Sequence, residues 1–320
     1  MKTFLPNWAL VWIVLCLVLM GHAAVADEPV FKDAGMDWTI FDALSDQDKS
    51  KFILAALDNR DRALANVRYT VHETSVNVGK NDGQRRFMTK ADYEVRRLGD
   101  QYWMHLKTHE YFDEDGRIEL EATLNWDGKK GKRLVPPEFS RANVPSGLIT
   151  STEDDNFSAR RLSELLGFRI RLMPNSIPVA QYIREALAGG AKLEATKVVK
   201  GATMLMQIAI QDQQWRREIW LDPDRGFMIV RIVNVYGKDY MKGTLEITDA
   251  ERVAAVWVPK RAVTTGTTYH DKEVTEITHE VKEFQVGGLK QHDVEIDFPA
   301  GTKVSDRINN VTYVVGVAGK

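Results

Sequence analysis

The stretch from Lys192 to about Phe298 holds seven strand-like segments in succession, separated by short turns rich in glycine, aspartate or proline. No helix-like segment interrupts them. Strands joined by tight turns pair in the antiparallel sense, whereas parallel strands need a long crossover connection after each strand. This pattern predicts an antiparallel sheet for the second half of the chain and excludes a repeating strand–helix–strand fold.

A first strand-rich block precedes this sheet. In "VRYTVHETSVNV", Val67, Tyr69 and Val71 alternate with polar residues, which is typical of a strand that is buried on one face. Further alternating segments follow, separated by turns at Gly99–Asp100 and after Trp126. The block therefore predicts a meander with one apolar face and one solvated face.

Helical patterns lie before and between the blocks. A long helix is expected from Ser45 to about Asn66, with a capping pair formed by Ser45 and Asp48. Two short amphipathic helices follow, "SARRLSELLG" and "SIPVAQYIREALAGG", with Pro178 in the first turn of the second. The fold class is thus α+β, mainly antiparallel β. The expected organisation is an irregular lead-in at 27–44, one domain at 45–300 with a helical insertion at about 158–190, and a C-terminal tail at 301–320 whose Val311–Val315 adds an edge strand.

The N-terminus predicts export. Lys2 precedes an apolar run from Trp8 to Met20, and Ala24 and Ala26 have the spacing that a signal peptidase requires. The run is shorter than the ~20 residues that span a bilayer, so a cleaved signal peptide at 1–26 is favoured over an uncleaved membrane anchor. Cleavage removes Cys16, the single cysteine, and leaves no disulfide or thiolate. We expect a periplasmic or secreted protein with no permanent membrane anchor.

No motif for catalysis or for metal binding is present. His105 and His109 lie on a predicted strand, where four residues span roughly 13 Å, so they cannot share one ion. The chain lacks a nucleophile elbow, and "GKKGK" lacks the spacing of a phosphate-binding loop. A formal net charge of −2 argues against a nucleic-acid partner. We predict no catalytic residue, no metal and no cofactor, with a site assembled from distant strands as the alternative.

The stretch "DPDRG" at 222–226 has two carboxylates and a glycine, as a calcium loop would. Counting from Asp222, however, positions 5, 6 and 12 are Gly226, Phe227 and Val233, so the ligand set fails. Pro223 favours a turn and Gly226 permits a positive φ. The stretch is predicted to be a hairpin connection.

Large apolar side chains mark a candidate binding surface. They suit either an ordinary core under the helices or an adaptable cavity for an apolar ligand. The candidate lid residues on the second short helix are Val179, Tyr182, Ile183 and Leu187. The candidate cavity residues are Tyr102, Met104, Leu106, Leu120, Leu124, Trp126, Met204, Met206, Ile208, Ile219 and Leu221.

Four features in order resemble a known group. They are the helix that runs into a strand in "ILAALDNRDRALANVRYTVHET", the hairpin "NWDGKKGKRL", the helical insertion, and the hairpin "EIWLDPDRGFMIVRIVNVY" with Trp220, Asp222 and Gly226. Over roughly 45–300 the chain resembles the periplasmic lipoprotein carriers of Gram-negative bacteria and the LolA-like lipoprotein-sorting and anti-sigma-factor-binding relatives. The resemblance implies an open, curved half-barrel sheet with helices covering the concave face, and an apolar ligand.

These observations lead to three functional hypotheses. The first is an exported, non-enzymatic binding protein that holds a lipid or an acylated protein in an apolar half-barrel cavity. The second is a protein-interaction or sensor module of the cell envelope with the same fold. The third is a hydrolase whose site is assembled across strands.

Overall fold

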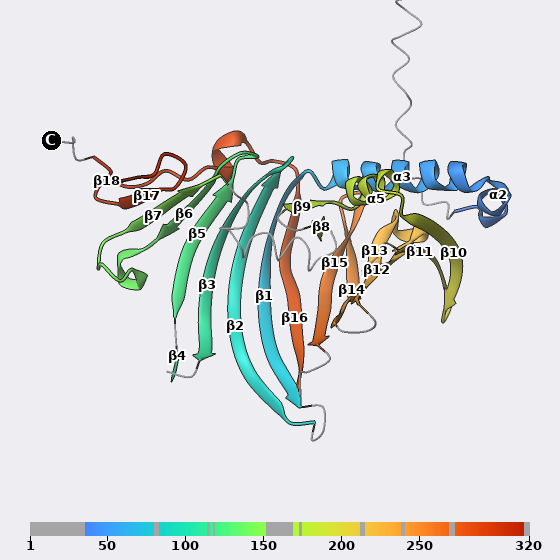
Figure 1. The fold of residues 1–320 in the computed structure, drawn as a ribbon, viewed down its shortest axis with the longest axis horizontal. Helices are drawn as coiled ribbons and strands as arrows, with labels where there is room; N and C mark the ends of the chain where they lie inside the picture. The colour runs from blue at the N-terminus through green and yellow to red at the C-terminus, as the bar shows by residue number, and fades with distance from the viewer. Residues whose placement is uncertain are drawn as a thin grey trace, which may run out of the picture. The chain divides into compact units, whose positions relative to one another are not determined.

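A single curved sheet organises the part of the chain that the computed structural model describes. Its strands follow the order β10-β11-β12-β13-β14-β15-β16-β1-β2-β3-β5-β6-β7-β17-β18, with β4 paired to β3. All of these neighbours are antiparallel except β7 and β17. The two blocks join where β16, the last strand of the second block, pairs with β1 (Figure 1). The predicted α+β class and the open, curved half-barrel sheet are confirmed.

The described residues are 36–79, 83–113, 116–117, 119–151, 169–172, 175–211, 215–237, 241–268 and 273–316. The predicted signal peptide, residues 27–35 of the lead-in and the expected helix at 158–167 lie outside them. Asp37–Lys320 form one compact unit, which contains every element named below.

The strands are longest at the centre of the sheet (Figure 1). Those of the first block are β1 (Asn66–Gly79), β2 (Arg85–Leu98), β3 (Gln101–Asp113), β4 (Gly116–Arg117), β5 (Leu120–Trp126), β6 (Gly131–Val135) and β7 (Ser146–Thr150). Those of the second block are β10 (Lys192–Lys200), β11 (Thr203–Gln211), β12 (Trp215–Asp222), β13 (Met228–Tyr236), β14 (Met241–Val253), β15 (Val256–Thr268) and β16 (Glu273–Val286). The tail adds β17 (Lys303–Asp306) and β18 (Val311–Val314), and β18 is the edge strand expected there.

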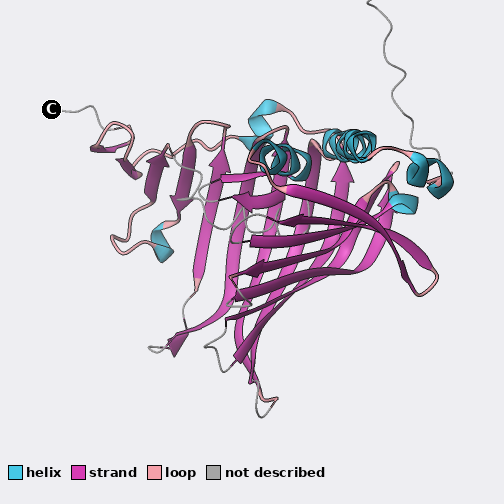
Figure 2. Ribbon diagram, turned by 45° about the vertical axis from the view of Figure 1, so that its right-hand side comes forward, coloured by secondary structure: helices cyan, strands magenta, loops and turns pink. Residues whose placement is uncertain are grey.

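The sheet curls strongly at its β10 end. Lys200 at the end of β10 forms an ion pair with Glu246 of β14, with 2.7 Å between Nζ and Oε1. Three strands separate β10 from β14, and a flat sheet would hold the two backbones about 19 Å apart. Figure 2 shows the strands of this end turning forward rather than continuing in the plane of the central strands.

Three helices accompany the sheet in the described residues: α2 (Trp38–Ala43), α3 (Asp46–Ala63) and α5 (Val179–Ala188). The predicted cap of α3 is confirmed, because the Asp48 N–H donates to Ser45 Oγ at 3.2 Å. Arg97 of β2 fixes the other end of α3, where its guanidinium donates to Asp61 Oδ1 at 2.9 Å and to the Leu64 carbonyl at 3.4 Å.

Two local predictions need correction. The lead-in contains the short helix α2, because the Asp37 carboxylate accepts hydrogen bonds from the amides of Thr39 and Ile40 and so caps a turn that the apolar pattern did not reveal. The helix expected from Ser176 begins only at Val179. Pro178, placed in the first turn by the sequence, is extended (ψ 147°) and ends β9 (Asn175–Pro178), which pairs with β8 (Arg169–Leu172).

The sheet has two chemically distinct faces, named here by the residues they carry. The inner face carries Val67, Tyr69 and Val71 of β1, all buried as the alternation predicts. The outer face carries Arg68, Thr70 and His72. The register extends the inner face sideways, since Tyr69 lies opposite Val95 and Val95 lies opposite Met104.

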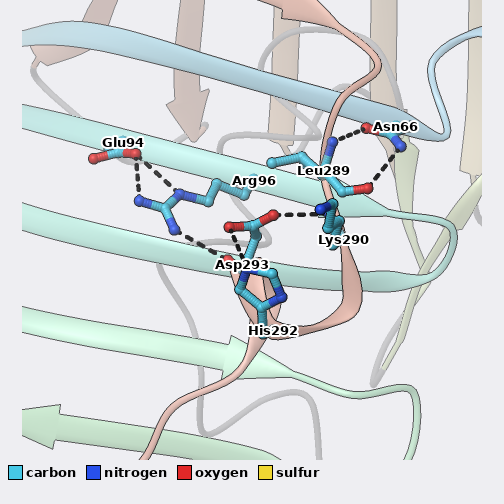
Figure 3. A network of polar contacts seen from close by, with 7 residues as sticks. All are labelled: Asn66, Glu94, Arg96, Leu289, Lys290, His292 and Asp293. Carbon is cyan, nitrogen blue, oxygen red and sulfur yellow. Dashed lines mark hydrogen bonds and ion pairs between the residues drawn. The ribbon is translucent and has the colours of Figure 1, made fainter.

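The segment after β16 crosses the outer face of β2 and β3 (Figure 3). Arg96 donates to Glu94 Oε1 at 2.9 Å and to the Asp293 carbonyl at 3.2 Å. Asn66 bonds both backbone groups of Leu289 through its amide side chain. These bonds, together with the 3-10 turn η4 (Gln291–Val294), hold the chain as it passes toward β17.

Candidate functional site

The predicted cavity residues lie on the inner face in two groups. Across β3 and β5, Met104 lies opposite Leu124, and Tyr102 lies opposite Trp126. Leu106 extends this first group and is buried, whereas Leu120, at the start of β5, is 39% exposed. Across β11 and β12, the register pairs Met206 with Leu221 and Ile208 with Ile219, all fully buried, with Met204 next to them and half-buried.

Six strands, β13 to β16 with β1 and β2, separate the two groups. The fold therefore does not gather the predicted residues into one cluster. It places them toward opposite ends of one inner face, and buried residues on the strands between them link the two ends. These linking residues are Val95, Tyr69, Val71, Val281, Ala262, Leu245 and Ile232.

A polar pair interrupts this apolar face at its centre. Glu73 of β1 lies directly opposite His279 of β16, and His279 Nε2 is 2.9 Å from Glu73 Oε2. His279 is 0% exposed and Glu73 is 6% exposed. Buried ionisable groups are rarely retained without a partner, so this contact accounts for one edge of the imidazole.

Further polar atoms lie around the pair. His279 Nδ1 has no hydrogen-bond partner among the described residues, and neither does Thr264 Oγ1 on β15, two residues beyond the position opposite His279. Ser75 follows Glu73 on the same face and is buried. The centre of the inner face thus offers hydrogen-bonding capacity within an apolar surround.

Neither His279 nor Glu73 belongs to a motif that is recognisable in the sequence. A signal for Glu73 was present, because the alternation of Val67, Tyr69 and Val71 places residue 73 on the buried face. The partner strand could not be read in the same way, since 206 residues separate the two side chains along the chain.

A nucleophilic hydrolase holds its nucleophile and base in a hydrogen bond. Among the described residues, no hydrogen bond joins the Ser75 hydroxyl to His279, whose Nε2 contacts Glu73.

The predicted lid helix α5 covers the inner face of the second block. The ring of Tyr182 lies 4.4 Å from the guanidinium carbon of Arg217 on β12. Val179 and Ile183 are buried with Tyr182, and Leu187 is half-buried. An ion pair from Arg184 to Asp58 links α5 to α3.

A histidine cluster lies on the outer face. Asp92 accepts from His72 at 2.8 Å through one oxygen and from His109 at 2.5 Å through the other. Burial raises the pKa of Asp92, but the bonds from the two histidines outweigh it and leave the pKa below its usual value. His105 instead contacts Thr123 at 3.2 Å and Glu121 at 3.5 Å. No group of three or more potential metal ligands occurs in the described parts of the chain.

The "DPDRG" hairpin has the predicted role. Pro223–Arg225 form the 3-10 turn η3, Asp222 Oδ1 accepts from the Asp224 amide at 3.1 Å, and Gly226 has a φ of 63°. Asp222 itself is buried, and burial raises the pKa of its carboxyl.

The described residues include no helix with the length and apolar character needed to cross a membrane.

No family model matches the chain, and no curated protein matches its sequence. Solved structures that resemble it include a DUF1329 family protein from Desulfovibrio piger, with 10% identity, a TM-score of 0.46, and 77% of this chain and 97% of that chain covered. A LolA superfamily protein from Nitrosomonas europaea has 11% identity, a TM-score of 0.43 and the same coverage. MucB, solved in complex with MucA(peri), has 9% identity, a TM-score of 0.22, and 75% and 100% covered.

Proposed function

We propose that the protein is an exported, non-enzymatic binding protein that holds the acyl chain of a lipid, or of a lipidated protein, against the inner face. The observation that carries this proposal is the row of buried apolar residues that runs along the inner face from β5 to β11, with the buried Glu73–His279 pair at its centre. Each methylene group that moves from water onto such a face contributes about 0.8 kcal/mol. Useful affinity therefore needs no polar motif in the sequence.

The Glu73–His279 pair gives this surface a polar position. In the proposal, a hydroxyl or ester group of the ligand bonds His279 Nδ1, while the acyl chain lies along the apolar rows on either side. Helix α5 and the β8–β9 hairpin act as the lid, and they move to admit the ligand. Tyr182 and Ile183 are the lid residues that close on the sheet.

The proposed location is the periplasm or the cell exterior, reached through the predicted signal peptide at 1–26. N-terminal sequencing of the protein from a secreting host tests this part, with a mature chain that starts at Asp27 expected. A chain that retains Met1 and fractionates with membranes would contradict it.

Lipid extraction of the purified protein followed by mass spectrometry tests the binding function directly. A co-purified lipid is expected, and unlabelled fatty acid should displace a fluorescent fatty acid from the delipidated protein. A protein that purifies without lipid and ignores the fluorescent probe would refute the proposal.

A pair of variants separates a ligand cavity from a packed core. Ala122 lies on the inner face opposite Leu106, and Lys107 lies next to Leu106 on the outer face. Ala122→Phe should raise the dissociation constant of the acyl probe at least tenfold with little loss of stability if the face has room for a chain. In a packed core the added ring would instead cost ~1–3 kcal/mol. Lys107→Phe is the control and should change neither quantity.

A second candidate function is a protein-interaction module of the envelope. The edge strand β18 favours it, because Val311 and Tyr313 are 49% and 42% exposed beside an unpaired sheet edge. Such an edge can accept a strand from a partner. If this is the function, Tyr313→Lys should abolish capture of one defined envelope protein, and acyl-probe binding should be absent.

A further inference from the structure

A cavity lies at the β10 end of the sheet, beside Trp220 of β12 and Arg231 of β13. It has a volume of about 250 Å³ and is lined by residues of β10 to β14 together with the η3 hairpin. Trp220 and Arg231 form one wall. They lie opposite each other across β12 and β13, and Trp220 follows the fully buried inner-face residue Ile219, so both point to the outer face.

The lining carries an excess of positive charge. Three bases, Lys200, Arg225 and Arg231, face the cavity with one carboxylate, Asp222. Arg225 Nε lies 3.4 Å from Asp222 Oδ2, and Lys200 is bound to Glu246 outside the lining. The two carboxylates of the neighbourhood are therefore both engaged by other bases.

Arg231 is left without an anion. Glu246 of β14 lies directly opposite Arg231 of β13, yet the Glu246 carboxylate accepts from Lys200 instead. Among the described residues, Arg231 makes no ion pair or hydrogen bond, and its Nε is buried without a partner. Its guanidinium packs over the Trp220 ring in a cation–π contact, with 5.3 Å between the guanidinium carbon and the ring centroid.

Trp220 adds a second free donor. Its indole Nε1 is also buried without a hydrogen-bond partner in the described part of the chain. Arginine and the indole N–H are donors only, so a ligand that satisfies them must supply acceptor atoms. A buried donor without a partner is destabilising, and a ligand that accepts a hydrogen bond from it removes that cost.

We propose that this cavity binds a small oxyanion, a carboxylate or a phosphate group, with Arg231 as its main ligand and Trp220 as a supporting donor. The guanidinium presents a planar fork that matches two oxygens of such a group. The cavity is smaller than the roughly 300–1,000 Å³ of sites for drug-sized ligands, so it admits the anionic group and little more. The apolar side chain of Leu205 and the Trp220 ring accommodate a short carbon stem.

The source of the oxyanion is either a free small molecule or the head group of an anionic lipid. Both present the same acceptor chemistry to Arg231. Inorganic phosphate and acetate serve as probes for the first source, and vesicles of phosphatidylglycerol serve for the second. Binding of either kind supports the site, and the comparison identifies the source.

The test uses the full mature chain labelled with ¹⁵N, in which the Trp220 indole resonance is assigned through Trp220→Phe. Titration with phosphate, acetate or vesicles should shift or broaden that resonance saturably. Arg231→Gln should raise the dissociation constant at least tenfold. Arg216→Gln is the matched control, because Arg216 is an exposed base on the same strand as Trp220 that pairs with Glu218, and it should leave binding unchanged.

Two results would overturn the proposal. One is a Trp220 resonance that responds to none of the three probes, which would mean that water alone occupies the cavity. The other is equal weakening by Arg231→Gln and Arg216→Gln, which would indicate diffuse attraction to positive charge. Trp220→Phe keeps an aromatic ring beside Arg231 and leaves the charge of Arg231 in place. It should therefore weaken binding, measured by calorimetry, by a smaller factor than Arg231→Gln does. Acyl-probe binding to the inner face should survive all three variants, so each proposal can fail without the other.

Discussion

Glu73 follows Val67, Tyr69 and Val71 on one face of β1, so the alternation that predicts a buried strand also places a carboxylate inside the sheet. The period-two pattern places Met104 and Met206 on the buried face of their strands, and both are fully buried. Contacts between residues far apart in the sequence were not predicted. His279 acquires its role only when β16 pairs with β1, and the sequence carries no local signal for a pairing between side chains 206 residues apart.

Substitution of Glu73 and His279, singly and together, should show that the two residues are strongly coupled in their effect on the free energy of unfolding. His279→Leu removes the histidine partner of a buried carboxylate and should cost about 3–5 kcal/mol of unfolding free energy. Glu73→Leu leaves the imidazole Nε2 without its acceptor and should cost about 1–3 kcal/mol. The double variant should cost clearly less than the sum, because it leaves neither group stranded. Urea denaturation of the four proteins measures the cycle, and additive costs would show that the contact contributes nothing.

Asp222 should make stability depend on pH. Burial raises its folded-state pKa, so between the ordinary value of 3.8 and the higher folded value the native protein holds more protons than the unfolded chain. Stability from this residue therefore falls as pH rises through that window. Asp222→Asn keeps an oxygen to accept from the Asp224 amide and removes the titration. The stability of this variant relative to the parent should rise from pH 3 upward and then level off. A flat difference across that range would contradict the raised pKa.

At the scale of elements, the helices show which sequence signals are sufficient to predict where a helix begins or ends. Ser45 begins α3 and Gly189 ends α5, because a capping hydroxyl and a glycine act on adjacent backbone groups and are visible in sequence. The start of α5 was misplaced, since Pro178 is compatible both with a first helical turn and with the end of a strand. The pairing of β8 with β9 holds Pro178 at the end of a strand rather than in a helical turn.

The lid role of α5 can be tested by loosening it. Ile183 is fully buried, and Ile183→Ala should cost about 2–4 kcal/mol through the cavity it leaves. Hydrogen exchange should accelerate first in 179–188, because the helix is anchored by few side chains whereas β1 and β16 lie at the centre of the sheet. Acyl-probe association should become faster. Glu185→Ala, on the exposed side of the same helix, is the control, and uniform acceleration across the sheet would rule out a separate lid.

At the scale of the whole molecule, the antiparallel class followed from the strand and turn pattern, but the joining of the two blocks into one open sheet did not. The join between β16 and β1 brings the end of one block to the start of the other, and no turn connects them. The curvature was expected only from the family resemblance. Curvature arises from the twist summed over many strands and from bulges such as those in β13 and β14, which the alternation does not encode.

The tail at 301–320 completes the other end of the sheet. Val304 of β17 is fully buried, and β17 runs parallel to β7 as its outer neighbour. Gly147 of β7 permits this packing, since a Cβ there would lie 2.9 Å from the Phe298 ring and 3.0 Å from Val304. Strand β17 is therefore part of the core at this edge.

Deletion of residues 301–320 should expose the backbone of β7 and remove the burial of Val304. The loss of one buried valine alone corresponds to about 1.5–3 kcal/mol, and an uncovered strand edge promotes pairing between molecules. The truncated protein should melt at a lower temperature and elute as a concentration-dependent oligomer in size-exclusion chromatography. Val304→Ala in the full chain should reproduce the loss of stability without the association, because β17 still covers β7. A truncated chain that stays monomeric with an unchanged melting temperature would show that β7 needs no cover.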